Sequence, residues 1–215
     1  MRPYKTLKQA ASDSFIVNKS RFIGHATPAS TEEAALDFLA AICAQYRDAT
    51  HNCYAYIVGE NAGIMRYSDD GEPGGTAGMP IIECRKARGV VNCCVVVTRY
   101  CGGVLLGAGG LVRAYSRGCA LALDAAQVVV MQPTARWWIE IEYPLWDRVS
   151  HMLANEPVQM ESTEFSATVN ASLLVRKTDE AALLQKLSTL TDGRAETLLA
   201  EELHHQWPEE AQQDR

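Results

Sequence analysis

The 215-residue sequence lacks the features that mark a secreted, disulfide-bonded or membrane-spanning protein. Its seven cysteines are odd in number and include no Cys-x-x-Cys pair, which disfavours a disulfide framework and a zinc finger. It has no long uncharged apolar run, and no apolar segment beside basic residues near its start. We therefore predict free, mostly buried thiols in a cytoplasmic protein with no membrane association.

Signatures of nucleotide hydrolysis and of acyl transfer are missing as well. The phosphate loop Gly-x-x-x-x-Gly-Lys-Ser/Thr is absent, and the dinucleotide pattern Gly-x-Gly-x-x-Gly fails because Val112 occupies the position of its third glycine. No Gly-x-Ser-x-Gly nucleophile elbow occurs, and His204-His205 has no second ligand pair at zinc-finger spacing. These absences predict no catalytic residues, no metal and no cofactor.

Acidic residues are absent between Cys84 and Leu123, although the whole chain carries a net charge of −6. Divided after Pro133, the chain has 13 basic and 11 acidic side chains in its first part and 7 basic and 15 acidic in the remainder, which gives net charges of +2 and −8. The first part therefore carries a local positive field, which favours a polyanionic partner. The acidic second part is expected to be a solvated accessory or protein-binding module.

A glycine-rich segment from Arg99 to Gly110 crosses this basic window and leads into an apolar helix predicted from about Gly110 to Ala126. Glycine lets a backbone approach a ligand closely, a helix N-terminus attracts anions, and arginine forms bidentate bonds with phosphate oxygens. The predicted phosphate-binding residues are Arg85, Lys86, Arg88, Arg99, Gly102, Gly103, Gly109, Gly110, Arg113 and Arg117. The alternative is that the glycines only form tight turns, while the arginines form surface ion pairs with Asp69, Asp70 or Glu72.

A second glycine-rich loop, from Ser68 to Pro80, is acidic. Together with the start of the preceding strand, it supplies a motif of unassigned role: His51, Asn52, Asp69, Asp70, Gly71, Glu72, Gly74 and Gly75. Its carboxylates suit either a divalent cation or the loop's own backbone N–H groups, and the short, glycine-rich sequence favours capping. His51 and Cys53 share one side of the strand, but no second pair completes a zinc site. Cys101, near Arg99, is the only cysteine in a setting that could lower its pKa, and the alternative is an inert thiol at the end of a strand.

The hydrophobic periodicity predicts an α+β protein with two domains, residues 1–133 and 134–207, followed by a disordered tail at 208–215. The first domain is expected to contain a helix capped by Ser30 or Thr31, a hairpin of His51–Val58 and Ile64–Ser68, a short helix from Pro80 to Arg88, a buried strand at 92–98 and a closing strand at 128–131. The second domain shows the order βαββαβ, with its first strand at 138–143, which is typical of a ferredoxin-like sandwich.

Three motifs follow one another in the first domain: THNCYAY (Thr50 to Tyr56), SDDGEPGGTAGMP (Ser68 to Pro80) and VVTRYCGGVLLGAGGLVRAY (Val96 to Tyr115). In this order they resemble the Impact family, in particular its bacterial members of the YigZ type. The resemblance implies an N-terminal α/β sandwich like the second domain of a small-subunit ribosomal protein and like domain four of elongation factor G. It also implies a C-terminal ferredoxin-like domain similar to domain five of that factor, and contact with RNA or ribosome-associated partners. Family members commonly carry an aromatic residue in place of Cys101 and a lysine in place of Leu105.

These observations predict a non-enzymatic nucleic-acid-binding or ribosome-associated protein, linked to translation or its regulation, that binds phosphate groups of structured RNA through the basic glycine-rich face. A rival from another class is a small enzyme acting on a phosphorylated or anionic metabolite, with Asp69, Asp70, Glu72 and His51 as acid, base or metal-binding groups. That enzyme requires these groups to converge within hydrogen-bond reach. A third interpretation is a protein-interaction module that uses the basic face or the acidic domain.

Overall fold

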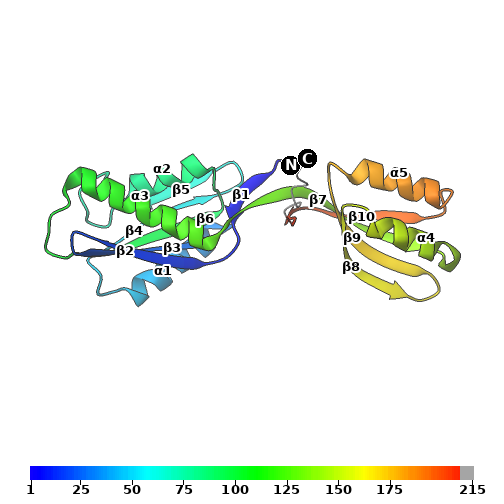
Figure 1. The fold of residues 1–215 in the computed structure, drawn as a ribbon, viewed down its shortest axis with the longest axis horizontal. Coiled ribbons are helices and arrows are strands. Elements are labelled where there is room, and N and C mark those ends of the chain that lie inside the picture. Colours follow the sequence, from blue (N-terminus) through cyan, green and yellow to red (C-terminus); the bar gives the residue numbers. More distant parts are fainter. Residues whose placement is uncertain (209–215) are drawn as a thin grey trace, which may run out of the picture. The chain divides into compact units, whose positions relative to one another are not determined.

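The computed structural model describes residues 1–208, so the predicted tail lies outside the described residues except for its first position. The chain divides into two compact units, one of Tyr4–Val130 and one formed by Met1–Pro3 together with the chain from Met131 onward. Both units combine helices with an antiparallel sheet, which confirms the predicted α+β class (Figure 1). None of the helices within residues 1–208 is long and apolar enough to cross a membrane.

The N-terminal unit is built on a five-stranded antiparallel sheet with the strand order β2-β3-β6-β4-β5. Its strands are β2 (Ala11–Val17), β3 (Ser20–Pro28), β4 (His51–Val58), β5 (Ile64–Ser68) and β6 (Cys93–Tyr100). The central strand β6 is buried from Cys93 to Arg99, as expected for a continuous apolar strand that is covered on both faces. A short strand β1 (Tyr4–Leu7) precedes the sheet and was not predicted from the polar start of the sequence.

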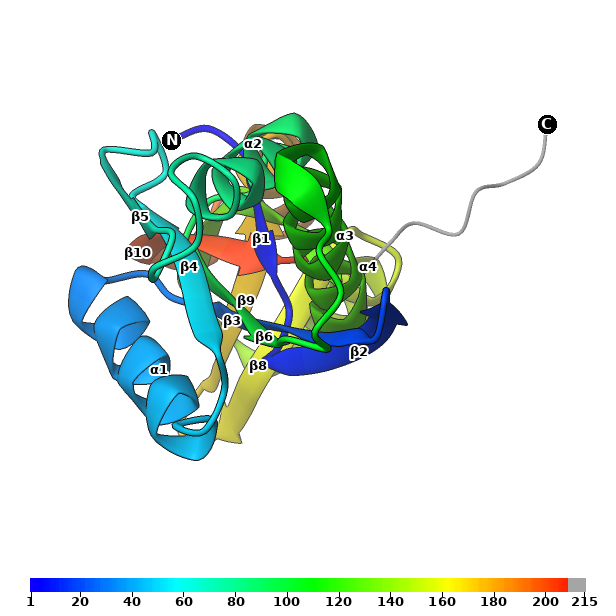
Figure 2. The same ribbon diagram turned by 90° about the vertical axis from the view of Figure 1, so that its left-hand side faces the viewer.

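Helices cover both faces of this sheet (Figure 2). Helix α1 (Glu32–Gln45) packs on one face, and its N-cap is Thr31, one of the two predicted candidates, whose side chain accepts a hydrogen bond from the Ala34 N–H. Helices α2 (Gly78–Arg88) and α3 (Gly107–Ala126) pack on the other face around a larger core. Helix α3 begins three residues before its predicted start. Gly109 and Gly110 therefore lie in its first turn.

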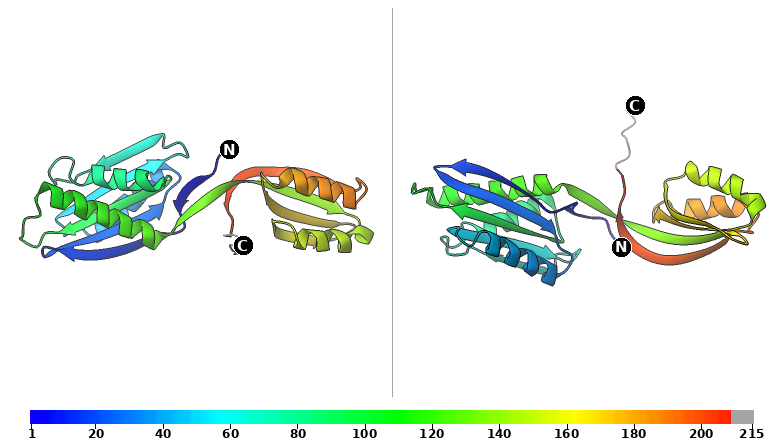
Figure 3. Two further views of the ribbon diagram at one scale, coloured as in Figure 1. Left: turned by 45° about the horizontal axis from the view of Figure 1, so that its top comes forward. Right: turned by 90° about the horizontal axis from the view of Figure 1, so that it is seen from below.

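The C-terminal unit has the predicted βαββαβ order. Its elements are β7 (Val128–Ile141), α4 (Tyr143–Ala154), β8 (Val158–Phe165), β9 (Val169–Arg176), α5 (Glu180–Leu190) and β10 (Glu196–Gln206). The strands pair antiparallel in the order β10-β7-β9-β8, and both helices cover one face of the sheet, where Ile139, Leu145 and Leu183 share a core (Figure 3). This arrangement confirms the ferredoxin-like fold. The opposite sheet face leaves Trp138 and Leu198 exposed.

Strand β7 corrects one prediction, because the sequence indicated two separate strands in this region. The strand instead runs without interruption through Pro133, whose carbonyl oxygen accepts a hydrogen bond from the Lys177 N–H. A proline has no N–H to donate to a sheet, so it suggested a break in the strand. The division between the two compact units falls inside β7, between Val130 and Met131.

Candidate anion-binding site

The acidic loop between β5 and α2 is held in shape by Asp69, whose carboxylate caps the N-terminus of α2. Asp69 Oδ1 accepts hydrogen bonds from the Ala77 N–H at 3.1 Å and the Gly78 N–H at 2.7 Å, and Oδ2 accepts one from the Gly75 N–H at 2.9 Å. Burial alone would raise the pKa of Asp69, but these three donors outweigh it and hold the pKa below its ordinary value. The carboxylate therefore satisfies the loop's own backbone, in agreement with the capping interpretation.

Asp70 joins the loop to the start of β4. The Asp70 carbonyl oxygen lies 2.7 Å from His51 Nδ1, and Asp70 Oδ2 accepts a hydrogen bond from the Asn52 N–H at 2.6 Å. Asp70 and Gly71 have positive φ angles of 43° and 83°, which a tight turn requires. Gly74 is exposed on the far side of the turn. The motif residues of this loop are thus bonded to one another.

The Glu72 carboxylate points into the interior of the N-terminal unit, where its side chain is only 3% exposed. Its Oε1 atom accepts hydrogen bonds from Arg99 Nη1 and from the Tyr115 hydroxyl, each at 2.7 Å. The Arg99 side chain is 9% exposed and also packs over the Phe22 ring. Arg99 therefore belongs to a buried ion pair, and its assignment to a phosphate-binding surface was wrong.

Arg85 is likewise removed from the predicted surface. Its side chain is fully buried, and Nη1 donates hydrogen bonds to the carbonyl oxygens of Ala55 at 2.7 Å and Cys93 at 2.9 Å. These bonds tie α2 to strands β4 and β6. Because a fully buried guanidinium cannot meet a ligand in solvent, Arg85 is a structural arginine and its predicted role in phosphate binding was wrong.

Lys86 and Arg88 stay near the surface, but each has an acidic partner. Lys86 Nζ lies 3.1 Å from Glu83 Oε1, and Arg88 forms an ion pair with Asp124 that joins α2 to α3. Glu83 and Asp124 are the first residues beyond the two ends of the acid-free window. The segment between Cys84 and Leu123 contains no acidic residue, but in the folded protein the acidic residues just outside it neutralise two of its positive charges.

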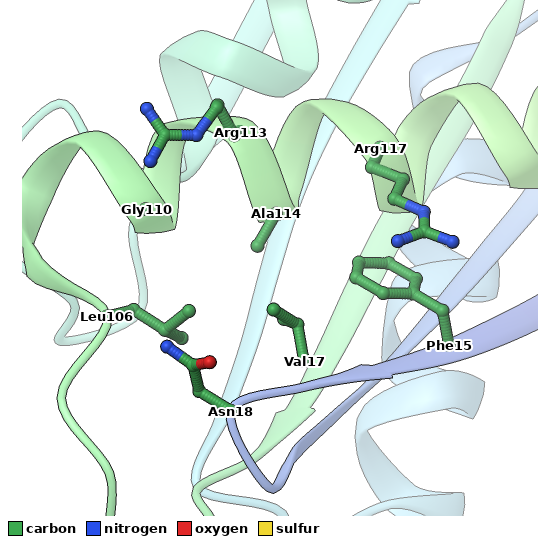
Figure 4. Close-up of a pocket in the computed structure, with 8 residues that line it drawn as sticks. All are labelled: Phe15, Val17, Asn18, Leu106, Gly110, Arg113, Ala114 and Arg117. Carbon is green, nitrogen blue, oxygen red and sulfur yellow. The ribbon is translucent and has the colours of Figure 1, made fainter.

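Arg113 and Arg117 remain exposed, one turn apart on α3, and neither has an ion-pair partner within residues 1–208. The Arg117 guanidinium lies 4.3 Å from the centre of the Phe15 ring, as in a cation–π contact. Arg113 folds back along α3 toward Gly110 (Figure 4). Of the predicted arginines, these two are available to an anion.

A pocket of about 200 Å³ opens between these arginines, bounded by α3 and by the β2–β3 hairpin (Figure 4). Its apolar lining is Phe15, Val17, Leu106 and Ala114. The sequence did not single out these four residues.

The glycines between β6 and α3 serve different purposes. A Cβ atom on Gly102 would lie 2.1 Å from the backbone carbonyl of Lys19, so this glycine permits close contact with the β2–β3 turn. Gly103 has a positive φ of 76° in an exposed turn. Gly109 and Gly110 occupy the first turn of α3, where Leu106 at the N-cap gives no side-chain hydrogen bond.

The acid, base or metal-binding groups required by the rival enzyme do not assemble into a free cluster. His51 Nε2 lies 3.8 Å from Glu72 Oε2, which is beyond hydrogen-bond reach, and Asp69 faces backbone N–H groups instead. Within residues 1–208, no group of three or more His, Cys, Asp or Glu side chains could hold a metal ion. The loop is organised mainly by bonds among its own residues.

Cys84, which the sequence did not single out, has a lowered pKa. A hydrogen bond from the Cys119 side chain and the nearby Arg88 charge lower the pKa of the Cys84 thiol on α2 to about 7. Cys119 lies fully buried on α3, and desolvation raises its pKa. The pair forms through the packing of α2 on α3, so no local sequence pattern could reveal it.

The fold and the site define a class of two-unit α+β protein, in which a helix of the N-terminal unit carries an exposed arginine pair beside an apolar pocket. Residues 18–123 match the family model described as the Impact N-terminal domain, and residues 139–194 match the model described as a domain of unknown function, DUF1949. The chain belongs to the Impact family.

Similar proteins cover nearly the whole chain. The IMPACT family member YvyE of Bacillus subtilis is 36% identical over 91% of this chain and 90% of its own length. An IMPACT family member from Thermus thermophilus is 40% identical over 83% of this chain and 97% of its own, and YigZ of Escherichia coli is 32% identical over 86% and 92%. A crystal structure of a hypothetical protein matches with a TM-score of 0.60 and 30% identity, covering 94% of this chain and 98% of that one.

Proposed function

We propose that the N-terminal unit binds phosphate groups of structured RNA or of a ribosomal site through Arg113 and Arg117. The observation that carries the proposal is that these two arginines are exposed, lie on one helix face and have no ion-pair partner within residues 1–208. Guanidinium groups form charge-assisted, bidentate hydrogen bonds with phosphate oxygens. The N-cap of α3 has no side-chain partner, so N–H groups of its first turn are available to the same anion.

The partner class is supported by what the resemblance to the Impact family implies, namely two domains like consecutive domains of elongation factor G. A ribosomal binding site would link the protein to translation or its regulation. With only two free arginines at the site and an acidic second unit, binding is expected to be modest and sensitive to salt.

The direct test is RNA affinity measured over a series of salt concentrations for the double variant Arg113→Ala with Arg117→Ala. Losing two phosphate contacts is expected to reduce the slope of log K against log salt by roughly 1 to 2. The matched control is Lys8→Ala with Arg66→Ala, which removes the same charge from exposed positions outside the pocket. Equal losses in both variants would show that only net charge matters and would contradict the site. Loss of folding in the arginine variant would show that these side chains are structural.

A second experiment addresses the partner. We expect tagged protein in cell lysate to sediment with ribosomal particles or a defined RNA at low salt, and to be released at high salt. Recovery should fall with the double arginine variant and persist with the control variant. If the wild-type protein sediments as a free protein and carries no RNA at low salt, the proposed function is wrong.

A second candidate function, binding of a basic protein partner, is favoured by the open sheet face of the C-terminal unit. Trp138 and Leu198 are cross-strand neighbours on this face, 44% and 66% exposed, and beside them Glu140 lies opposite Glu196. Like charges directly opposite each other destabilise a sheet, and neither carboxylate has an ion-pair partner within residues 1–208. A lysine-rich peptide should therefore bind wild-type protein more tightly than the Glu140→Gln, Glu196→Gln variant. Equal affinities would rule this face out.

A further inference from the structure

The pocket on α3 combines an apolar floor with a polar, basic lining, and a phosphate group alone would use only the basic lining. Its floor is apolar, formed by Val17 and Ala114 with Leu106 and Phe15 at opposite ends. Its polar lining is Asn18, Arg113 and Arg117. A ligand that fits both surfaces must join a small apolar or aromatic group to an anion.

The size of the pocket limits that group. A volume of about 200 Å³ lies below the roughly 300 to 1,000 Å³ of pockets that enclose drug-sized molecules. The pocket therefore suits one ring system. The two guanidinium groups lie at its two ends along α3, with Arg113 turned toward Gly110 and Arg117 held over Phe15 (Figure 4).

We propose that this pocket receives the base of one unpaired RNA nucleotide, while Arg113 and Arg117 bind the phosphates on either side of it. The inference rests on the proposed function, which it extends from phosphate binding to recognition of single-stranded RNA. Unpaired bases stack on guanidinium planes as well as on aromatic rings. The Phe15 ring already packs against Phe22 and beneath Arg117, so it holds the Arg117 guanidinium in place, and the open face of that guanidinium is the stacking surface for the base. A base inside a duplex would first have to unstack and unpair, so a duplex is the weaker ligand.

The test fills the pocket without changing its charge. Val17→Trp places a large side chain in the pocket, and Ile16→Trp is the matched control, because Ile16 is the adjacent strand residue, is 70% exposed and does not line the pocket. The probes are a labelled oligouridylate of about 12 nucleotides and an RNA duplex of equal length, compared by fluorescence anisotropy at low salt. Leu106→Phe, which fills the pocket from its other side, serves as a second variant should Val17→Trp not fold.

We expect the wild-type protein and Ile16→Trp to bind the single strand about tenfold more tightly than the duplex. Val17→Trp and Leu106→Phe should lose this preference and bind both probes with similar, weak affinity. The Arg113→Ala, Arg117→Ala variant should lose affinity for both probes. Uridine monophosphate should compete only at far higher concentration, since it lacks the second phosphate.

Two failures are distinguishable. If wild-type protein binds single strand and duplex equally, or if filled pockets keep the preference while the arginine variant loses binding, the base pocket is wrong and phosphate binding stands. If wild-type protein binds neither probe at low salt, the proposed function fails and this inference fails with it. Saturation by uridine monophosphate at the affinity of the oligonucleotide would make a free nucleotide the occupant and overturn the assignment to RNA.

Discussion

Replacing Glu72 with glutamine is expected to destabilise the N-terminal unit by about 3 to 5 kcal/mol, because removing one partner of a buried ion pair leaves the other charge uncompensated. Arg99 depends on this carboxylate, since its Nε atom is buried with no hydrogen-bond partner within residues 1–208. Glutamine keeps the volume of the side chain, and its oxygen can still accept a hydrogen bond from the Tyr115 hydroxyl. The loss of stability therefore reports the removal of the negative charge alone. For a unit of about 130 residues, the midpoint of thermal unfolding should fall by roughly 10 to 15 °C.

The distribution of tryptophan provides an assay for each unit separately. All four tryptophans, Trp137, Trp138, Trp146 and Trp207, lie in the C-terminal unit. Tryptophan fluorescence therefore follows unfolding of that unit, while far-ultraviolet circular dichroism follows both units. We expect Glu72→Gln to shift the dichroism transition and to leave the fluorescence transition in place.

A mutant cycle tests the reasoning. Arg99→Met should also destabilise the unit, and the double variant Glu72→Gln with Arg99→Met should cost less than the sum of the two single variants, because no unpaired charge remains. Glu33→Gln, an exposed carboxylate of the same unit outside the ion pairs described, is the matched control and should change stability by less than about 0.5 kcal/mol. A loss below about 1 kcal/mol in Glu72→Gln, or strict additivity in the cycle, would refute the buried ion pair as a source of stability.

Three further predictions concern other parts of the N-terminal unit. Burial lowers the pKa of His25 to about 4, so the unfolded state takes up a proton near pH 6.5 while the folded state stays unprotonated until about pH 4. The free energy of unfolding should therefore fall by about 3 kcal/mol as the pH drops from 6.5 to 4. Urea unfolding of the His25→Gln variant should show a smaller fall over the same pH range. Gly102→Ala should cost more than about 2 kcal/mol in thermal unfolding because its Cβ would overlap the Lys19 carbonyl, whereas Gly109→Ala, whose Cβ meets only Arg113 Nη1 at 3.5 Å, should fold normally. Iodoacetamide at neutral pH should alkylate Cys84 before Cys53 and Cys94, as mapped by mass spectrometry, because Cys84 is only half-buried and has a lowered pKa, whereas burial raises the pKa values of the other two thiols.

Features with a local cause were predictable from the sequence. The β4–β5 hairpin was predicted with its observed bounds, because two β-rich segments flank a turn that includes Gly59 and Gly63. The N-cap of α1 was narrowed to Ser30 or Thr31, because a hydroxyl just before a helix satisfies an N–H of its first turn, and Thr31 is the cap. The βαββαβ order of the second domain was predicted because apolar residues alternate, as in a strand, and then recur at helical spacing, and this sequence of patterns occurs twice.

Features that depend on long-range packing were not predictable. The burial of Arg85 requires carbonyl oxygens from two different strands, and in the sequence it is indistinguishable from the exposed Lys86 beside it. Arg99 and Arg113 looked equivalent as well, but only Arg99 lies on a central strand facing Glu72. The sequence therefore gathered these basic residues into one region but could not separate the buried, structural arginines from the exposed ones.

The acidic loop and the arginine pair face opposite sides of α3, and this separation yields a last prediction. Tyr115 lies between Arg113 and Arg117 in the sequence, but its side chain is buried and its hydroxyl donates to Glu72, so the loop holds the helix from within the unit. Tyr115→Phe leaves one acceptor of a buried carboxylate unpaired and should cost about 1 to 3 kcal/mol of stability. The RNA affinity of the folded variant should not change, since Arg99 still neutralises Glu72 and the outer helix face is intact. Measured below its unfolding transition, a Tyr115→Phe protein with reduced affinity would contradict this division of roles and would place the acidic loop in the RNA-binding site.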